Sequence, residues 1–175
     1  MQDEQPLRMV VMGVSGCGKS SLGLALSQAL ALPLIEGDDF HPPANIAKMR
    51  AGIPLVDADR EDWLRTLGER LQGHAQGAVL TCSALKRAYR DQLRTAAPGL
   101  RFVFMRIEAE EAQRRVAERA GAHMFPASLV ASQFATLESP EGEAGVLTVG
   151  AGAPLAVSVQ TVRDWLATMA GPSRP

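Results

Sequence analysis

The chain is poor in cysteine and histidine, with two of the first and three of the second among 175 residues. Cys17 and Cys82 lack the companion spacing of a disulfide framework or a thiolate metal site. The histidines, His41, His74 and His123, include no pair four residues apart, so nothing in the sequence supports a zinc site. Both thiols are therefore expected to be reduced, as is usual in the cytoplasm.

The chain also lacks a surplus of charge and a long apolar run. Eighteen basic and 19 acidic residues leave a formal net charge of −1, so no general positive field attracts nucleic acid or an anionic membrane. No segment approaches the length of about 18 apolar residues that a membrane-spanning helix needs. The first six residues carry acidic side chains where a secretory signal has basic ones. We therefore expect a cytoplasmic protein with no nucleic-acid or membrane partner.

The remaining composition is that of an ordinary globular domain, with 46% hydrophobic and 21% charged residues. Neither an internal repeat nor a Pro/Gly/Ser-rich linker divides the chain. This predicts a single domain over residues 1–175, with a loose tail at 171–175 after the helix-breaking pair Gly171-Pro172.

Short apolar runs alternate with helical patterns along the chain, which is typical of a parallel sheet covered by helices on both faces, an α/β fold. Strands are expected at 9–14, 33–36, 78–82, 102–107 and 146–149. Amphipathic or charged segments predict helices at 21–30, 59–72, 86–96, 108–119 and 155–169. In such sheets the ligand lies beyond the carboxyl ends of the strands, so the residues after each run are the candidate site.

The most specific pattern follows the first of these runs and has the form G-x-x-x-x-G-K-[ST] of a phosphate-binding loop. In such a loop, backbone N–H groups surround phosphate oxygens, a lysine reaches the β- and γ-phosphates, and a hydroxyl can ligate Mg²⁺. The pattern predicts binding of ATP and Mg²⁺, with Lys19 as a catalytic group and Ser20 as the metal ligand. The candidate nucleotide-binding residues are Gly13, Val14, Ser15, Gly16, Cys17, Gly18, Lys19, Ser20 and Ser21 of this segment, together with Arg115.

Carboxylates and a histidine follow the second expected strand, at Asp38, Asp39 and His41. A kinase needs a carboxylate to accept the proton of the attacking hydroxyl or to organise Mg²⁺. We assign this role to Asp38 and interpret Asp39 as a capping or solvated residue. His41 could bind a substrate hydroxyl or anchor the turn before Pro42.

Basic side chains near the same crevice are candidates for holding an anionic substrate. Lys86 and Arg90 are four residues apart, which on a helix would place them on one face and allow them to clamp a carboxylate. Together with Asp38 and His41, the candidate substrate residues are Lys48, Arg60, Ser83, Lys86 and Arg90. Arg115 and Arg119 also share a helical face, and an arginine on a closing lid could stabilise the transferring phosphoryl group. A plain helical salt-bridge face is the alternative.

Across residues 9–166 the sequence resembles the bacterial-type gluconokinase family of P-loop kinases. The resemblance rests on MGVSGCGKS at 12–20, EGDDFHP at 36–42, NIAKM at 45–49, GIPLVDADREDWL at 52–64, CSALKRAYRD at 82–91 and SQFATLESP at 132–140. It implies phosphorylation of the 6-hydroxyl of D-gluconate by ATP, a three-layer P-loop kinase fold with a short mobile lid near 114–126, and a homodimer. It further implies that Arg60 lies at the sugar-acid site and that Arg119 is the lid cation.

The expected lid departs from the family pattern Gly-His-Phe-Met-Pro, because residues 121–126 read GAHMFP. This difference leaves open a binding protein that has lost catalysis, although Lys19, Ser20 and Asp38 favour an enzyme. A kinase for shikimate or another polyol acid is a second alternative. A GTPase-type switch is disfavoured, because the chain has neither Asn-Lys-x-Asp nor an Asp-x-x-Gly motif after the third expected strand.

Overall fold

The computed structural model describes residues 5–119 and 126–170. Residues 120–125 of the expected lid, which include His123, and the expected tail at 171–175 lie outside the described residues.

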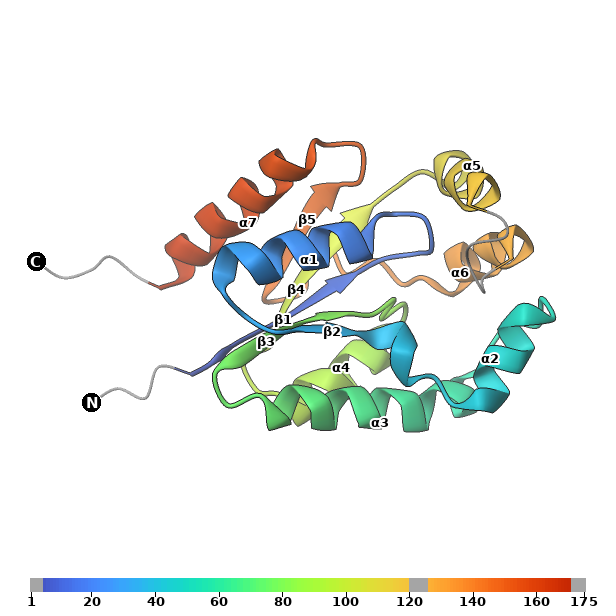
Figure 1. Cartoon of the computed structure of the whole chain (residues 1–175), viewed down its shortest axis with the longest axis horizontal. Helices are drawn as coiled ribbons and strands as arrows, with labels where there is room; N and C mark the ends of the chain where they lie inside the picture. The colour runs from blue at the N-terminus through green and yellow to red at the C-terminus, as the bar shows by residue number, and fades with distance from the viewer. Residues whose placement is uncertain (1–4, 120–125, 171–175) are drawn as a thin grey trace, which may run out of the picture.

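A five-stranded, fully parallel sheet forms the centre of the molecule (Figure 1). The strand order is β2-β3-β1-β4-β5. The strands are β1 (Leu7–Met12), β2 (Leu34–Glu36), β3 (Gly77–Thr81), β4 (Arg101–Arg106) and β5 (Val146–Gly150). The five predicted strands are thus confirmed, with boundaries that differ by no more than two residues.

Helices cover both faces of this sheet, as expected for the α/β fold. In Figure 1, α1 and α7 lie above the sheet and α3 and α4 lie below it. The helices are α1 (Lys19–Leu30), α2 (Pro43–Arg50), α3 (Asp57–Gly73), α4 (Arg87–Ala96), α5 (Ala109–Glu118), α6 (Val130–Thr136) and α7 (Leu155–Met169), with short 3₁₀ turns η1 (Gly37–Phe40) and η2 (Ala127–Leu129). None of the helices in the described ranges is long and apolar enough to cross a bilayer.

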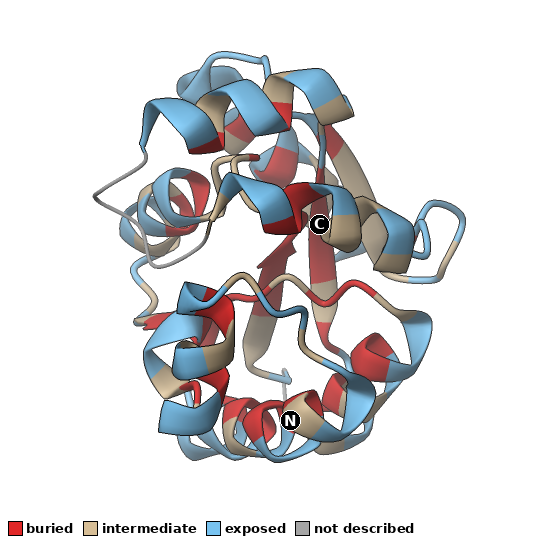
Figure 2. Cartoon of the chain, turned by 90° about the vertical axis from the view of Figure 1, so that its right-hand side faces the viewer, coloured by how far each residue is buried: buried red, intermediate tan, exposed pale blue. Residues whose placement is uncertain are grey.

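The core lies between the two helical layers, where the central strands are buried (Figure 2). All five residues of β3 are buried. The predicted apolar face of α3 packs onto this core through Trp63, Leu64, Leu67 and Leu71, each no more than 2% exposed. Strands buried on both faces read as continuous apolar runs, which is why the sequence located them well.

Two short helices were not predicted. In α2 only Asn45 and Met49 are buried, and in α6 only Val130. Each helix has only about two turns, which is too short for the apolar period that the sequence analysis relied on to stand out. Both helices lie beside the site described next, so the sequence missed part of its wall.

Candidate active site

A cleft of about 620 Å³ lies at the carboxyl ends of β1, β2 and β3. The loop after β1, the start of α1 and α6 form one wall, and the opposite wall comes from η1, α2 and the start of α3. This is the position that the topology of a parallel sheet predicts for a ligand.

The phosphate-binding loop has the backbone geometry that its glycines permit. Gly18 caps the N-terminus of α1 with φ 100°, a left-handed conformation that favours glycine. At Gly13, a Cβ atom would lie 2.8 Å from Cys17 Sγ and 2.9 Å from the Met105 carbonyl oxygen, so a side chain does not fit. The loop thus turns tightly into the positive end of α1, where backbone N–H groups can bind phosphate.

Lys19 lies inside the curve of this loop. Its Nζ donates to the carbonyl oxygens of Gly13 and Val14, at 3.0 and 3.1 Å. Gln133 of α6 reaches the loop from the other side, because its Oε1 accepts a hydrogen bond of 2.6 Å from the Ser15 backbone N–H. Both side chains line the cleft. Gln133 was quoted in the sequence only within SQFATLESP and was not assigned a role.

The predicted nucleotide residues divide into two groups. Ser15, Gly16, Gly18, Lys19 and Ser20 line the cleft. Among the described residues, the other four do not line the cleft. Gly13, Val14 and Cys17 form the buried side of the loop, and Ser21 lies exposed on α1. Cys17 and Cys82 are free thiols, as predicted. Burial raises the pKa of the Cys82 thiol to about 12 and keeps it protonated.

Ser20 and Glu36 bring two oxygen ligands together at the end of the phosphate-binding loop. Ser20 Oγ donates to Glu36 Oε2 at 3.2 Å, and Thr81 Oγ1 donates to the same carboxylate oxygen at 2.6 Å. A hydroxyl and a carboxylate are the hard oxygen donors that Mg²⁺ takes, with the remaining positions filled by water and phosphate. The residues present therefore fit a magnesium ion. The sequence analysis missed Glu36, although it is the last residue of β2.

Asp38 and His41 lie across the cleft from the phosphate-binding loop, on the side where the acceptor of a phosphoryl group would bind. His41 is stacked on Trp63 with ring centroids 4.1 Å apart, and its Nδ1 lies 3.4 Å from Asn45 Nδ2. Since the amide can only donate there, Nδ1 accepts and the proton sits on Nε2, which lies 3.7 Å from Asp38 Oδ1. Burial lowers the pKa of His41, against the opposing effect of Asp38, so the ring is neutral.

Asp39 also lines the cleft. Of the two interpretations offered for it, capping is wrong, because the N-cap residues of η1 and α2 are Glu36 and Pro42, whereas its exposed position agrees with a solvated residue.

Arg60, Ser83 and Arg119 reach the same cleft, as predicted for each. Arg60 is 9% exposed and lies on the first turn of α3. Arg119 is the exposed C-cap residue of α5 and approaches from the phosphate side. Arg50 of α2, which the sequence analysis did not name, is a further cation in the cleft. The cleft thus joins a nucleotide-binding loop to a carboxylate, a neutral histidine and cations.

The chain is similar in sequence to proteins of one enzyme family. A family model described as AAA domain matches residues 9–140. The gluconokinase of Gluconobacter oxydans is 47% identical over 150 residues, which cover 83% of each chain. The thermosensitive gluconokinase of Escherichia coli is 40% identical over 77% of this chain and 73% of its own. The chain belongs to the gluconokinase family. The resemblance inferred from the motifs is thereby confirmed.

A solved structure agrees with this membership. The crystal structure of a gluconokinase from Sinorhizobium meliloti matches with a TM-score of 0.81 and 45% identity, over 94% of this chain and 98% of that one. The P-loop kinase fold and a phosphotransferase that uses ATP are thus confirmed for this member of the family.

In this gluconokinase-family protein, Lys86 is not one of the described residues that line the cleft. Its Nζ lies 2.9 Å from Asp57 Oδ1. The expected clamp with Arg90 is wrong because Lys86 is the extended N-cap residue of α4, with φ −97° and ψ 150°. The four-residue spacing rule applies only within a helix, so it does not bring these two cations to one face.

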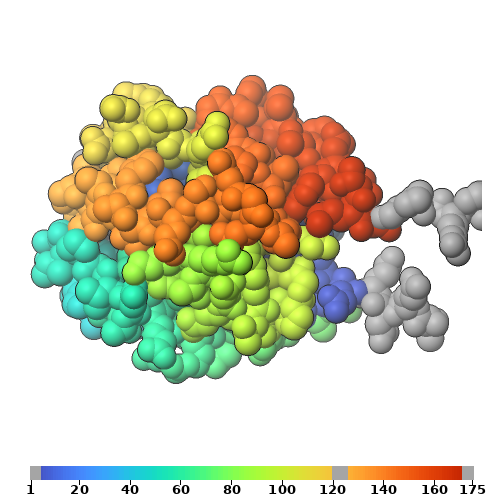
Figure 3. All heavy atoms as spheres, turned by 180° about the vertical axis from the view of Figure 1, so that it is seen from behind, coloured from blue at the N-terminus to red at the C-terminus, as the bar shows by residue number. Residues whose placement is uncertain are grey.

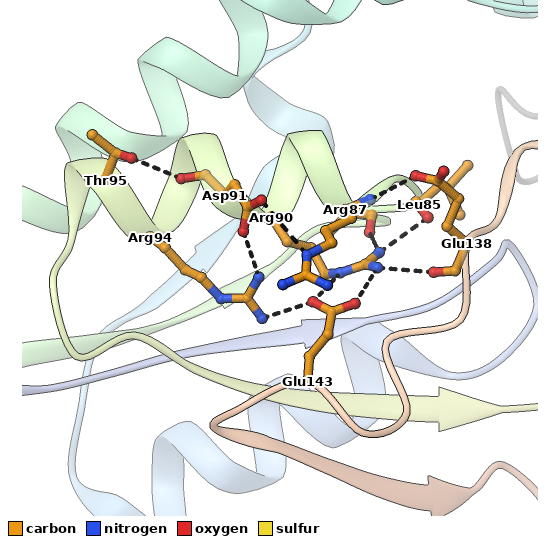
Figure 4. Close-up of polar contacts among 9 residues, drawn as sticks. Leu85, Arg87, Arg90, Asp91, Arg94, Thr95, Glu138 and Glu143 are labelled. Carbon is orange, nitrogen blue, oxygen red and sulfur yellow. Dashed lines mark hydrogen bonds and ion pairs between the residues drawn. The ribbon is translucent and has the colours of Figure 1, made fainter.

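Arg90 is a structural residue, which corrects its assignment to the substrate. Its side chain is fully buried, and all its N–H groups donate within the protein (Figure 4). Nη1 donates to the carbonyl oxygens of Ala84 and Leu85, and Nη2 donates to that of Glu138. Nε and Nη2 form a bidentate pair with Glu143 at 3.1 and 2.6 Å.

This network ties two distant segments of the chain together. The Leu85 carbonyl also accepts from the Glu138 N–H at 2.8 Å, and Glu138 Oε1 accepts from the Arg87 N–H at the start of α4. In Figure 3 the orange segment near residues 126–145 lies along the yellow-green segment that contains α4. Ala84 sits between them with φ 45°, a left-handed conformation that a non-glycine residue adopts only when it is held. The network therefore fixes the loop that carries Ser83 into the cleft.

We expect the removal of one partner of this buried pair to destabilise the fold strongly. Glu143 is 8% exposed, and hydrogen bonds from Arg90 and Arg94 lower its pKa despite the opposing effect of burial. Replacing Glu143 with alanine leaves Arg90 buried without a counter-charge and should reduce the free energy of unfolding by about 3–5 kcal/mol in urea denaturation. Because the native pKa is lowered, the pair stabilises the fold above the ordinary pKa of glutamate and ceases to do so as the pH falls through the native value.

Glu141 is the matched control, since it pairs with Arg106 at the surface, with side chains 44% and 65% exposed. Its replacement with alanine should cost less than about 1 kcal/mol. Equal losses from the two variants would contradict the role assigned to the buried pair.

Lys48 and Arg115 were also predicted to contact ligands, yet neither lines the cleft within the described ranges. Lys48 Nζ pairs with Asp59 at 2.8 Å. Two residues turn a helix by about 200°, so Lys48 lies on the opposite face of α2 from Arg50. Arg115 donates to the carbonyl oxygen of Gly16 at 3.2 Å and supports the phosphate-binding loop from behind.

Proposed function

We propose that this protein transfers the γ-phosphoryl group of ATP to the 6-hydroxyl of D-gluconate, giving 6-phospho-D-gluconate and ADP. The observation that carries the proposal is the cleft, in which the phosphate-binding loop faces Asp38, His41 and Arg60. The names of the curated relatives support gluconate as the acceptor.

On the nucleotide side, backbone N–H groups of the loop and Lys19 hold the phosphates. Ser20 and Glu36 would hold Mg²⁺, which when bound neutralises charge on the β- and γ-phosphate oxygens. Arg119 supplies a further cation to the transferring group. Such preorganised charge is the main source of catalysis in phosphoryl transfer.

On the acceptor side, Arg60 binds the gluconate carboxylate and Asp38 accepts the proton of the 6-hydroxyl. The hydroxyl oxygen then forms a bond to the γ-phosphorus while the bond from that phosphorus to the β-γ bridging oxygen breaks, and ADP leaves with that oxygen. The neutral His41, whose Nε2–H lies beside Asp38, orients this carboxylate. Ser83 is a further hydroxyl for the polyol chain.

The test is a coupled assay of ADP release with a panel of gluconate, other sugar acids and shikimate. We expect gluconate to give the highest kcat/KM, because Arg60 and Asp38 match a carboxylate at one end of the acceptor and a hydroxyl at the other. ADP release that is greatest with shikimate, or that no sugar acid stimulates, would contradict the proposal.

We also propose a single domain over residues 1–175 with a lid at 114–126, a homodimer, and a cytoplasmic location. The resemblance to the family supports the lid and the dimer. Sedimentation velocity at two protein concentrations tests the dimer.

A further inference from the structure

A chain of polar contacts runs from the surface of α4 to the acceptor side of the cleft. Lys86 Nζ donates to Asp57 Oδ1 at 2.9 Å. The Tyr89 hydroxyl donates to the same carboxylate oxygen. Arg60 Nη1 donates to the Tyr89 hydroxyl at 3.3 Å. Of these four residues, Arg60 lines the cleft and the other three do not, so the contacts approach the site from behind.

The contacts of Arg60 leave part of its guanidinium free for a ligand. Nη1 donates to the Leu55 carbonyl oxygen at 2.8 Å as well as to Tyr89. The guanidinium carbon also lies 5.5 Å from the centre of the Tyr89 ring. Among the residues that the structure describes, no acceptor contacts Nε or Nη2. One nitrogen is thus held by the protein, and the rest of the fork can bind a carboxylate.

Asp57 determines how the Tyr89 hydroxyl is used. A phenol has one proton to donate and lone pairs to accept with. The proton goes to Asp57, so the lone pairs face Arg60. Hydrogen bonds from Tyr89 and then Lys86 lower the pKa of Asp57, so this carboxylate is ionised. Burial and the bond to Asp57 raise the pKa of Tyr89, which therefore keeps its proton.

We propose that Tyr89 is a positioning residue for the acceptor carboxylate, which fixes the Arg60 guanidinium while Asp57 and Lys86 fix the Tyr89 hydroxyl. The inference rests on the proposed function, in which Arg60 binds the carboxylate of gluconate. It also gives Lys86 an indirect part in substrate binding, two contacts removed from Arg60.

The first experiment is steady-state kinetics of Tyr89→Phe, which removes the hydroxyl and keeps the ring. We expect the KM for gluconate to rise about three- to tenfold, as for loss of one hydrogen bond, with kcat and the KM for ATP changed by less than about twofold. A purely structural role would instead lower the melting temperature and leave the KM for gluconate unchanged. That result would overturn the proposal.

Lys86→Ala is a second variant that leaves the core intact. It should raise the KM for gluconate by a smaller factor than Tyr89→Phe does. Arg87→Ala is its matched control, because Arg87 is the next residue, is exposed, and pairs only with Asp91 at 3.8 Å among the described residues. This control should leave both KM values unchanged. An equal effect of the two variants would mean that helix charge, and not the contact with Asp57, changes the KM.

A double-mutant cycle with Arg60→Ala separates this inference from the proposed function. If Tyr89 acts through Arg60, Tyr89→Phe has no further effect on the gluconate KM once Arg60 is alanine. The same rise in both backgrounds would overturn the positioning role. If Arg60→Ala itself leaves the gluconate KM unchanged while the wild type turns gluconate over, the carboxylate site of the proposed function is misplaced, and the inference falls with it.

Discussion

Replacing Lys19 with alanine should lower kcat by about a thousandfold or more, because preorganised positive charge at the transferring phosphoryl group supplies most of the catalysis in this chemistry. Lys19 Nζ contacts only the Gly13 and Val14 carbonyls and the Cys17 sulfur among the described residues, so the fold should survive its removal. The measurements are ADP release at saturating gluconate and a thermal melt of the same sample.

Arg65→Ala is the control for loss of one positive charge, since Arg65 is 58% exposed and pairs with Asp62 on the surface of α3. It should retain wild-type turnover. A well-folded Lys19→Ala protein with wild-type kcat would contradict a catalytic role for the phosphate-binding loop.

Asp38→Asn should lower kcat by about 10²- to 10⁴-fold, because asparagine keeps the shape of the side chain and cannot accept the proton of the attacking hydroxyl. Binding of ATP, measured by calorimetry, should be nearly unchanged. Asp38 is well placed for this, since its side chain lines the cleft, is 71% exposed and lies 3.7 Å from the neutral His41.

The neighbouring carboxylate provides the control. Asp39 also lines the cleft, so Asp39→Asn makes the same chemical change one residue away. The kcat of this control variant should be nearly that of the wild type. A large loss at Asp39 and a small one at Asp38 would show that the proton acceptor is the other member of the pair.

The sequence predicted those parts of the site that are set by local pattern. The glycine loop, Lys19 and the carboxylate after β2 follow from a motif or from the end of a buried strand, and these positions depend little on the rest of the chain. The three central strands, β1, β3 and β4, were located for the same reason, because continuous apolar runs mark strands that are buried on both faces.

Side-chain direction could not be predicted in the same way. Lys86, Arg90 and Lys48 are cations near the crevice in sequence, and each pairs with an acidic residue at least 11 positions away. Those partners are brought in by tertiary packing, which no spacing rule describes. Glu36 and Gln133 were missed for the complementary reason, since their contacts with the phosphate-binding loop cross between separate segments.

The buried network of hydrogen bonds around Arg90 also limits when this part of the chain can fold. Arg90 and its partner Glu143 are 53 residues apart in the sequence, and closing a loop of this length costs entropy before any contact repays it. During synthesis the phosphate-binding loop and the first three strands emerge before residue 143 does. Until then the guanidinium of Arg90 has no counter-charge and is better placed in water than in the core. The left-handed turn at Ala84 can therefore be held in place only once Glu138 and Glu143 are in position, and the loop that carries Ser83 into the cleft is fixed together with them.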